Sequence, residues 1–216
     1  MIDIQDQIDY FESLFDEHGN SYKALDWNSP DSQKLRFKIM KELFNYGKKA
    51  SCITLLDVGC GFGDLYGYLK SDGSLSRHRI NYSGCDISPK IIQTAKKKYP
   101  DAKFEVKNIL EDRHTPKYDY IICSGIFNIR SAEIDDHLAY VKEMIFRVSE
   151  LATYGVGLNF LSEGSLPIAD PQNLNSSQYF YFNPETVLNF CRHAAPKYIL
   201  RHDYHIGDFT IYLLKG

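Results

Sequence analysis

Three glycines at alternate positions follow the first strongly apolar run of the chain. In LLDVGCGFGDL, residues 55–65, an acidic residue, Asp57, precedes Gly59, Gly61 and Gly63. Because glycine has no Cβ, such a turn lets the backbone adopt unusual φ/ψ values and approach a ligand closely. The helix expected after the turn offers unpaired N–H groups and a partial positive charge at its first turn. The segment therefore predicts a strand, a ligand-binding turn and a helix.

The spacing of these glycines indicates which class of ligand the turn binds. Dinucleotide-binding turns have the spacing G-x-G-x-x-G and place a pyrophosphate at the helix N-terminus. The spacing here is G-x-G-x-G, and a third glycine this early suits a ligand without a pyrophosphate. An ordinary glycine-rich turn is the alternative. The pattern D-x-G-x-G-x-G resembles motif I of the class I S-adenosylmethionine-dependent methyltransferases, which implies S-adenosylmethionine as cofactor and S-adenosylhomocysteine as product.

Composition limits the class of protein. The 216 residues suit one domain. A net charge of −3 and a pI of about 6.2 argue against a broad nucleic-acid-binding surface. No apolar run approaches the roughly 20 residues of a membrane helix, and the acidic, amphipathic N-terminus is not a secretory signal. The five cysteines contain no C-x-x-C pair, so we expect a cytoplasmic protein without a metal site.

From residue 52 onward, apolar runs alternate with amphipathic ones. We expect strands at 52–56, 80–85, 102–106, 118–123, 154–160, 198–204 and 209–214, and helices from 65 and at 89–99, 134–149 and 184–193. Repeated β–α units predict a parallel, doubly wound α/β sheet. The last two strands predict an antiparallel hairpin through residues 205–208. The class I resemblance implies a Rossmann-like, seven-stranded, mostly parallel sheet with helices on both faces and this antiparallel C-terminal hairpin.

The N-terminal region has its own pattern. Helical spacing covers residues 2–15, and a second helix is expected at 30–46, capped by Ser29 with proline at its first position. EHGNSYKALDWNSPDSQKLRF, SGIFN, NFLS and HDYHIGDFT resemble a group of bacterial class I methyltransferases. The resemblance implies that residues 1–50 form a helical lid, packed on the same domain as the methyltransferase region, residues 51–216.

Two residues of this N-terminal region are candidates for ligand contact. Arg36 shares a helix face with Gln33, and we expect it to pair with the methionine carboxylate of the cofactor or to be a surface charge. Trp27, the only tryptophan, either faces substrate or packs within the lid. Tyr22 has the same two alternatives.

Further cofactor residues are expected where the second and third strands end. Asp86, in GCDIS, is placed to accept hydrogen bonds from ribose hydroxyls, although it could instead cap the next helix. Ile87 would cover one face of the adenine. In the family resembled, a residue after the third strand meets the adenine amino group; Asn108 has that position, with Ile109 beside it. An ordinary loop turn at Asn108 is the alternative.

The fourth strand ends in CSGIFNIR, beyond its carboxyl end, where open α/β sheets bind ligands. The resemblance gives this segment the role of motif IV, with the backbone around Ser124 and Gly125 holding the methionine amino group. Phe127 would shield the sulfonium, stack on substrate or pack in the core. Asn128 and Arg130 contact substrate or lie in a surface loop. The expected cofactor-binding residues are Arg36, Asp57, Gly59, Cys60, Gly61, Gly63, Asp86, Ile87, Asn108, Ile109, Ser124 and Gly125.

No catalytic base is evident from the sequence. The candidates are Asn128, Asn159, His137, His202, His205 and Asp208. His205 with Asp208 could form an oriented base, but a plain hairpin turn is the other interpretation. Residues 160–185 interrupt the β–α alternation, and their aromatic end, with Tyr179, Tyr181 and Phe182, forms either a substrate wall or simple packing.

Together these patterns predict methyl transfer from S-adenosylmethionine to oxygen or nitrogen of a small molecule or glycan-linked acceptor. The alternatives are an RNA methyltransferase and a non-catalytic S-adenosylmethionine-binding module. The acidic balance and the lack of an N-P-P-Y-type tetrad at the fourth strand count against methylation of a nucleobase amino group. We expect no nucleic-acid or membrane partner, and a monomer or homodimer.

Overall fold

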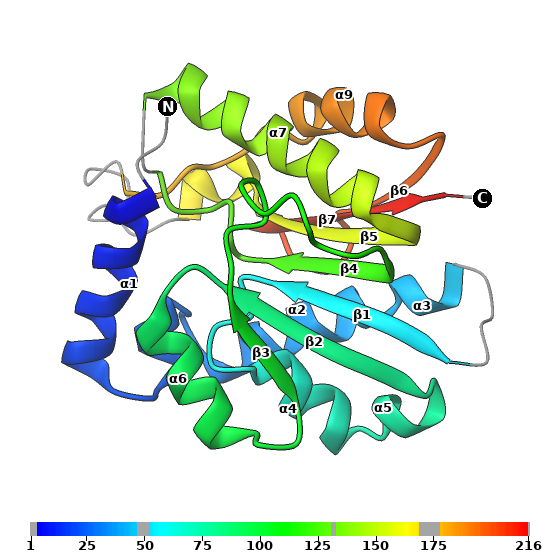
Figure 1. Ribbon diagram of the computed structural model, residues 1–216. Helices are drawn as coiled ribbons and strands as arrows, with labels where there is room; N and C mark the ends of the chain where they lie inside the picture. Colours follow the sequence, from blue (N-terminus) through cyan, green and yellow to red (C-terminus); the bar gives the residue numbers. More distant parts are fainter. Residues whose placement is uncertain (1–3, 47–51, 131–132, 169–177, 216) are drawn as a thin grey trace.

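Seven strands form one mixed sheet in the computed structural model of the protein (Figure 1). The structure describes residues 4–46, 52–130, 133–168 and 178–215. The strand order is β3-β2-β1-β4-β5-β7-β6. The strands are β1 (Ile53–Val58), β2 (Ile80–Asp86), β3 (Lys103–Val106), β4 (Tyr118–Ser124), β5 (Ala152–Leu161), β6 (Lys197–Arg201) and β7 (Asp208–Leu214).

Strand direction follows the predicted pattern. β1, β2, β3, β4 and β5 pair in parallel, while β7 pairs antiparallel with both β5 and β6. All seven expected strands are confirmed, as is the antiparallel C-terminal hairpin. The prediction that β6 runs to residue 204 is wrong, since β6 ends at Arg201. Side-chain bonds close the connection instead: His205 Nδ1 accepts from the Gly207 N–H at 3.0 Å.

Helices cover both faces of the sheet because its central strands are apolar on both sides. Figure 1 shows α7 (Ile134–Leu151) and α9 (Pro184–Ala194) on one face. The other face carries five helices: α2 (Pro30–Lys41), α3 (Leu43–Tyr46), α4 (Asp64–Ser71), α5 (Ser74–Arg77) and α6 (Pro89–Lys98). Each face has its own buried apolar cluster. The predicted Rossmann-like α/β architecture is confirmed.

Local signals account for most helix ends. Ser29 caps α2 by accepting the Ser32 N–H at 3.1 Å, as predicted. The single helix expected at 30–46 is interrupted at Glu42, whose N–H bonds to the Ile39 carbonyl three residues back, so that α2 and α3 are separate. The predictions omitted three short helices: η1 (Tyr22–Leu25), α5 and η2 (Glu163–Ile168).

The N-terminal segment lies at the carboxyl ends of the first strands. Helix α1 (Ile4–His18) and η1 pack through Phe11, Phe15 and Leu25 against Phe62 and Ile91. Helix α2 contacts β4 and β5. A lid function for residues 1–50 stays a prediction. Across the described residues, no helix is both long and apolar enough to span a membrane.

Candidate cofactor and acceptor pocket

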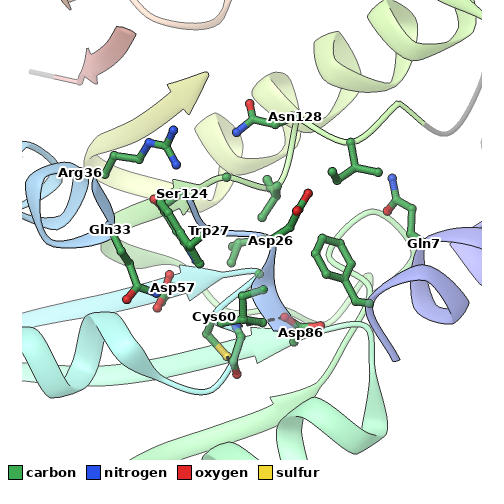
Figure 2. Close-up of a pocket in the computed structure, with 18 of the residues that line it drawn as sticks. Gln7, Asp26, Trp27, Gln33, Arg36, Asp57, Cys60, Asp86, Ser124 and Asn128 are labelled. Atoms are coloured by element: carbon green, nitrogen blue, oxygen red, sulfur yellow. Dashed lines mark hydrogen bonds between the residues drawn. The ribbon is translucent and has the colours of Figure 1, made fainter. Parts of the chain in front are cut away.

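A cavity of about 530 Å³ opens at the carboxyl ends of β1, β2 and β4 (Figure 2). This volume lies within the range of about 300–1,000 Å³ that is usual for small-molecule sites. One wall consists of strand ends and the turns that follow them. The opposite wall comes from the N-terminal segment, from the chain after β4 and from residues near Tyr179 and His205. We call these the strand-end wall and the outer wall.

The glycine turn after β1 has the close approach that its composition predicts. Gly59 and Gly61 have φ values of +68° and +54°, a region that favours glycine. A Cβ on Gly59 would lie 2.1 Å from Ile126 Cγ2, and one on Gly61 would lie 2.7 Å from Leu25 Cδ1. Both glycines line the cavity together with Cys60. Gly63 instead precedes α4 and faces Phe104, outside the lining.

Asp86, at the end of β2, holds this turn in place. Its carboxylate accepts the Gly61 N–H and the Ser88 N–H, each at 3.1 Å. The cap of α6 is Ser88, whose hydroxyl oxygen accepts the Ile91 N–H at 3.2 Å. Burial raises the pKa of Asp86, against the lowering effect of the backbone N–H groups. Asp86 therefore anchors the glycine turn and lines the cavity, whereas Ser88 caps helix α6.

Asp57 is the most deeply buried acid of the strand-end wall. Its side chain is 3% exposed and accepts the Tyr82 hydroxyl at 2.6 Å. Desolvation raises the pKa of Asp57 to about 7, because the charged form has left water. A bound cation would reverse this penalty, and the predicted cofactor carries two positive groups.

The predicted adenine contacts come together beside Asp86. Ile87, Asn108 and Ile109 all line the cavity. The Asn108 side chain also makes the turn that was its alternative, since its Oδ1 accepts the Leu110 N–H at 3.1 Å. Asn108 therefore forms the loop turn and lines the cavity at the same time.

The chain after β4 crosses the cavity between the two walls. Ser124, Gly125 and Asn128 line it. The Ser124 hydroxyl is buried and has no hydrogen-bond partner among the described residues. Asn128 is 7% exposed, and its Oδ1 accepts the Leu161 N–H at 2.9 Å. The side-chain carbonyl of Asn128 therefore binds the backbone at the end of β5.

Phe127 does not face the cavity. Its side chain is fully buried, and its ring stacks on Phe160 with the centroids 4.7 Å apart. Of the three roles open to Phe127, the structure supports core packing. The two roles that require Phe127 to face the cavity, shielding the sulfonium and stacking on substrate, are wrong, because the chain turns between Ile126 and Asn128 and directs this ring into the core.

Arg36 lies in the outer wall but already has a partner. Its Nε and one terminal nitrogen donate to the Asp208 carboxylate at 2.9 and 2.7 Å. The guanidinium also lies 4.6 Å from the centre of the Trp27 ring. With 11% of its side chain exposed, Arg36 is no surface charge. Gln33, on the same helix face, donates to Asp64 at 3.2 Å.

The candidate bases are placed very differently from one another. His205 lines the cavity, but Asp208, its predicted partner, is 3.6 Å away and is held by Arg36. Asn159 is fully buried and donates to the Phe209 carbonyl at 3.2 Å, outside the lining. His137 is fully buried and has a lowered pKa because of desolvation. His202 is exposed and lies outside the lining as well.

Two residues that the sequence reasoning missed, Asp26 and Tyr10, meet at the outer wall with Tyr179, which it had named. Asp26 accepts the Tyr10 hydroxyl at 3.1 Å and the Tyr179 hydroxyl at 2.9 Å. Asp26, Trp27, Tyr179 and Tyr181 line the cavity. The available signal was an acid immediately before the only tryptophan, in a segment rich in turn-forming residues. The interrupting segment 160–185 supplies Tyr179 and Tyr181, while its residues 169–177 lie outside the described residues.

Comparison with known proteins finds methyltransferases among both the sequence relatives and the solved structures. A model described as a methyltransferase domain matches residues 56–146. A Mycobacterium tuberculosis protein that is named as a methyltransferase is 27% identical over 169 residues, which cover 77% of this chain and 96% of that one.

Solved structures share the fold. Magnesium protoporphyrin IX methyltransferase from Synechocystis, with bound S-adenosylhomocysteine, has a TM-score of 0.64 at 15% identity and covers 98% of this chain and 94% of its own. An N-methyltransferase from Bradyrhizobium japonicum, in complex with the same product, has a TM-score of 0.63 at 13% identity, covering 95% and 98%. With the family match, the strand order and the glycine turn in agreement, the chain belongs to the class I S-adenosylmethionine-dependent methyltransferases.

Proposed function

We propose that this enzyme transfers the methyl group of S-adenosylmethionine to an oxygen or nitrogen atom of a small molecule or glycan-linked acceptor. The observation that carries the proposal is the two-walled cavity. Its strand-end wall has the residues expected to bind the cofactor, and its outer wall adds polar and aromatic groups beyond them. A cofactor site alone would not need the second set.

The cofactor would extend along the strand-end wall. We place the adenine beside Ile87, Asn108 and Ile109, and the ribose hydroxyls at Asp86. The methionine end would lie toward Ser124 and Arg36. The unpartnered hydroxyl of Ser124 supports this orientation, because a buried polar group without a partner is unfavourable and an incoming amino group would supply one.

The protein contributes position and electrostatics, since the bound cofactor supplies the activated methyl group. Transfer is an in-line displacement, so the acceptor atom must lie opposite the departing sulfur. Asp57 and Asp86 favour positive charge at the strand-end wall. The outer wall excludes water and orients the acceptor.

We propose that residues 1–50 act as the lid of this site. Trp27 lies beside Gly125: a Cβ built on that glycine would be 3.9 Å from the indole ring. Leu25 covers Gly61 from the same segment. Opening of this segment would uncover the glycine turn, so we expect it to move during cofactor exchange.

Calorimetry and product analysis test the proposal. S-adenosylmethionine and S-adenosylhomocysteine should bind, and NAD should bind weakly at most. Incubation with S-adenosylmethionine and a metabolite panel should release S-adenosylhomocysteine. Tighter binding of NAD would contradict the cofactor assignment, and release only with RNA would favour the RNA alternative. Tight cofactor binding without turnover on any acceptor would identify a binding module.

A further inference from the structure

One charged group in the cavity has no part in the cofactor site described above. Among the residues that the structure describes, four carboxylates line the cavity: Asp26, Asp57, Asp64 and Asp86. Three of them belong to the strand-end wall, at or after β1 and β2. Asp26 alone comes from the outer wall. Figure 2 draws it between Trp27 and Gln7, above Cys60 and Asp86.

The backbone at Asp26 adopts an uncommon conformation. Its φ and ψ are 58° and 36°, in the left-handed region, where aspartate is tolerated better than most residues. Such residues persist only where their surroundings fix them, and they gather at functional sites. Here two tyrosines from distant parts of the chain hold the side chain.

The two tyrosines orient the carboxylate without neutralising it. Tyr10 donates to one oxygen and Tyr179 to the other, and Gln178 donates in turn to the Tyr10 hydroxyl. Each carboxylate oxygen has about two acceptor positions, so one position on each stays available. Within the described part of the chain, no lysine or arginine forms a recorded ion pair with Asp26, and burial raises its pKa.

The cations of the cavity are already paired. Arg36 binds Asp208 at 2.7 Å, and Lys107 lies 2.9 Å from Asp112. The outer wall therefore presents an uncompensated carboxylate in a cavity that the rings of Phe11, Trp27 and Tyr181 also line. A negative group in a cavity lined by aromatic rings is complementary to a cation on an apolar body.

We infer that Asp26, oriented by Tyr10 and Tyr179, binds the methyl acceptor as an amine and takes the proton that this amine must lose. The inference rests on the proposed function and names the acceptor class of the same site. A protonated amine binds as an ion pair, gives its proton to the Asp26 carboxylate and regains its lone pair. The lone pair then forms the N–C bond as the C–S bond breaks, and its electrons stay on sulfur.

The charges balance over this sequence. One ammonium and one sulfonium become one methylated ammonium, a neutral thioether and one proton, which the Asp26 carboxyl group returns to water. A hydroxyl acceptor fits less well. An alkylammonium has a pKa of about 10.4, whereas water has a pKa of about 15.7 and an alcohol is similarly weakly acidic. A carboxylate is closer in pKa to the ammonium, and proton transfer is more efficient with the closer match.

A matched pair of probes tests this assignment in the full-length protein. Calorimetry with saturating S-adenosylhomocysteine compares phenethylamine with 2-phenylethanol, which differ in the amine and hydroxyl groups. We expect the amine to bind at least about tenfold more tightly. In Asp26→Asn the two affinities should agree within about twofold. Asparagine suits the left-handed backbone and still accepts a tyrosine hydroxyl, so the variant keeps the local structure.

Two controls separate the possible failures. The exposed Asp31→Asn removes the same charge outside the cavity and should keep the amine preference. S-adenosylhomocysteine affinity should stay within about twofold in both variants. If neither probe binds the product complex, if both bind equally, or if Asp26→Asn keeps the preference, the inference is overturned while cofactor binding stands. If the wild-type protein does not bind S-adenosylhomocysteine, the proposed function itself fails.

Discussion

The two walls of the cavity are built in opposite ways. The strand-end wall takes its residues from the ends of adjacent parallel strands, and each group has partners close by in the turn or sheet. The outer wall joins segments that are far apart in the chain: Tyr10, Asp26 and Tyr179 are separated by 16 and 153 residues. In the proposed function, the cofactor binds to the regular part of the fold. The acceptor then contacts the irregular part.

The largest expected effect concerns Arg36, which ties α2 to β7 through Asp208. Arg36→Ala leaves a buried carboxylate without its partner, so we expect the free energy of unfolding to fall by about 3–5 kcal/mol. Denaturant unfolding measures this change in the free energy of unfolding. The double variant Arg36→Met, Asp208→Leu should recover more than half of the loss. No recovery would show that Arg36 stabilises the outer wall by some means other than this ion pair.

Asp57 should make the stability of the strand-end wall depend on pH. Its pKa is raised from 3.8 to about 7 in the folded protein, so the native state binds more protons than the unfolded state between these values. Stability is therefore greatest below about pH 4 for this group and is lost as pH rises through about 7, by at most about 4 kcal/mol.

Asp57→Asn should flatten this part of the pH profile, measured by thermal or denaturant unfolding without cofactor. Asp101→Asn is the control, because the pKa of this exposed carboxyl group is lowered by Lys70. An unchanged slope in Asp57→Asn would mean that other groups set the pH dependence. A slope abolished by both variants would contradict the assignment to Asp57.

Asp86→Ala should weaken cofactor binding, because it removes the proposed ribose partner and releases the Gly61 N–H. The expected loss is about 1.5–3 kcal/mol, measured by calorimetry with S-adenosylhomocysteine. The aspartate caps a backbone turn as well, so Asp86→Asn serves as the matched variant that keeps one acceptor. Unchanged affinity in the alanine variant would leave Asp86 as an anchor of the turn alone.

The smallest effect should come from Tyr10→Phe in the outer wall. One hydrogen bond to Asp26 is lost and the ring stays, so stability should fall by about 1 kcal/mol. Acceptor affinity should fall, while the affinity for S-adenosylhomocysteine stays constant. A parallel loss of cofactor affinity would show that the two walls are coupled through α1, against the separation described above.

The same contrast explains what the sequence could predict. Apolar runs separated by turn residues are local signals, so the strands and the glycine turn were found from residues next to one another. Asp86 was found because the turn and the tip of β2 have a regular spacing. The contacts of Arg36 with Asp208 and of Asp26 with Tyr179 depend on how distant segments meet, which no local pattern encodes. The three roles of Phe127 stayed open for a related reason, since the rotation of one residue decides whether a ring faces a cavity or the core.

The position of β7 also orders the assembly of the sheet. β6 has no strand to pair with until β7 has been made, because β7 lies between β6 and β5 in the sheet and follows β6 in the chain. The glycine turn and its first four strands can assemble as soon as they exist, from neighbours already made. The far half of the sheet must wait, and contacts between distant segments form slowly. During synthesis, the enzyme would complete its binding floor before it could close the side of the sheet on which Arg36 and Asp208 meet.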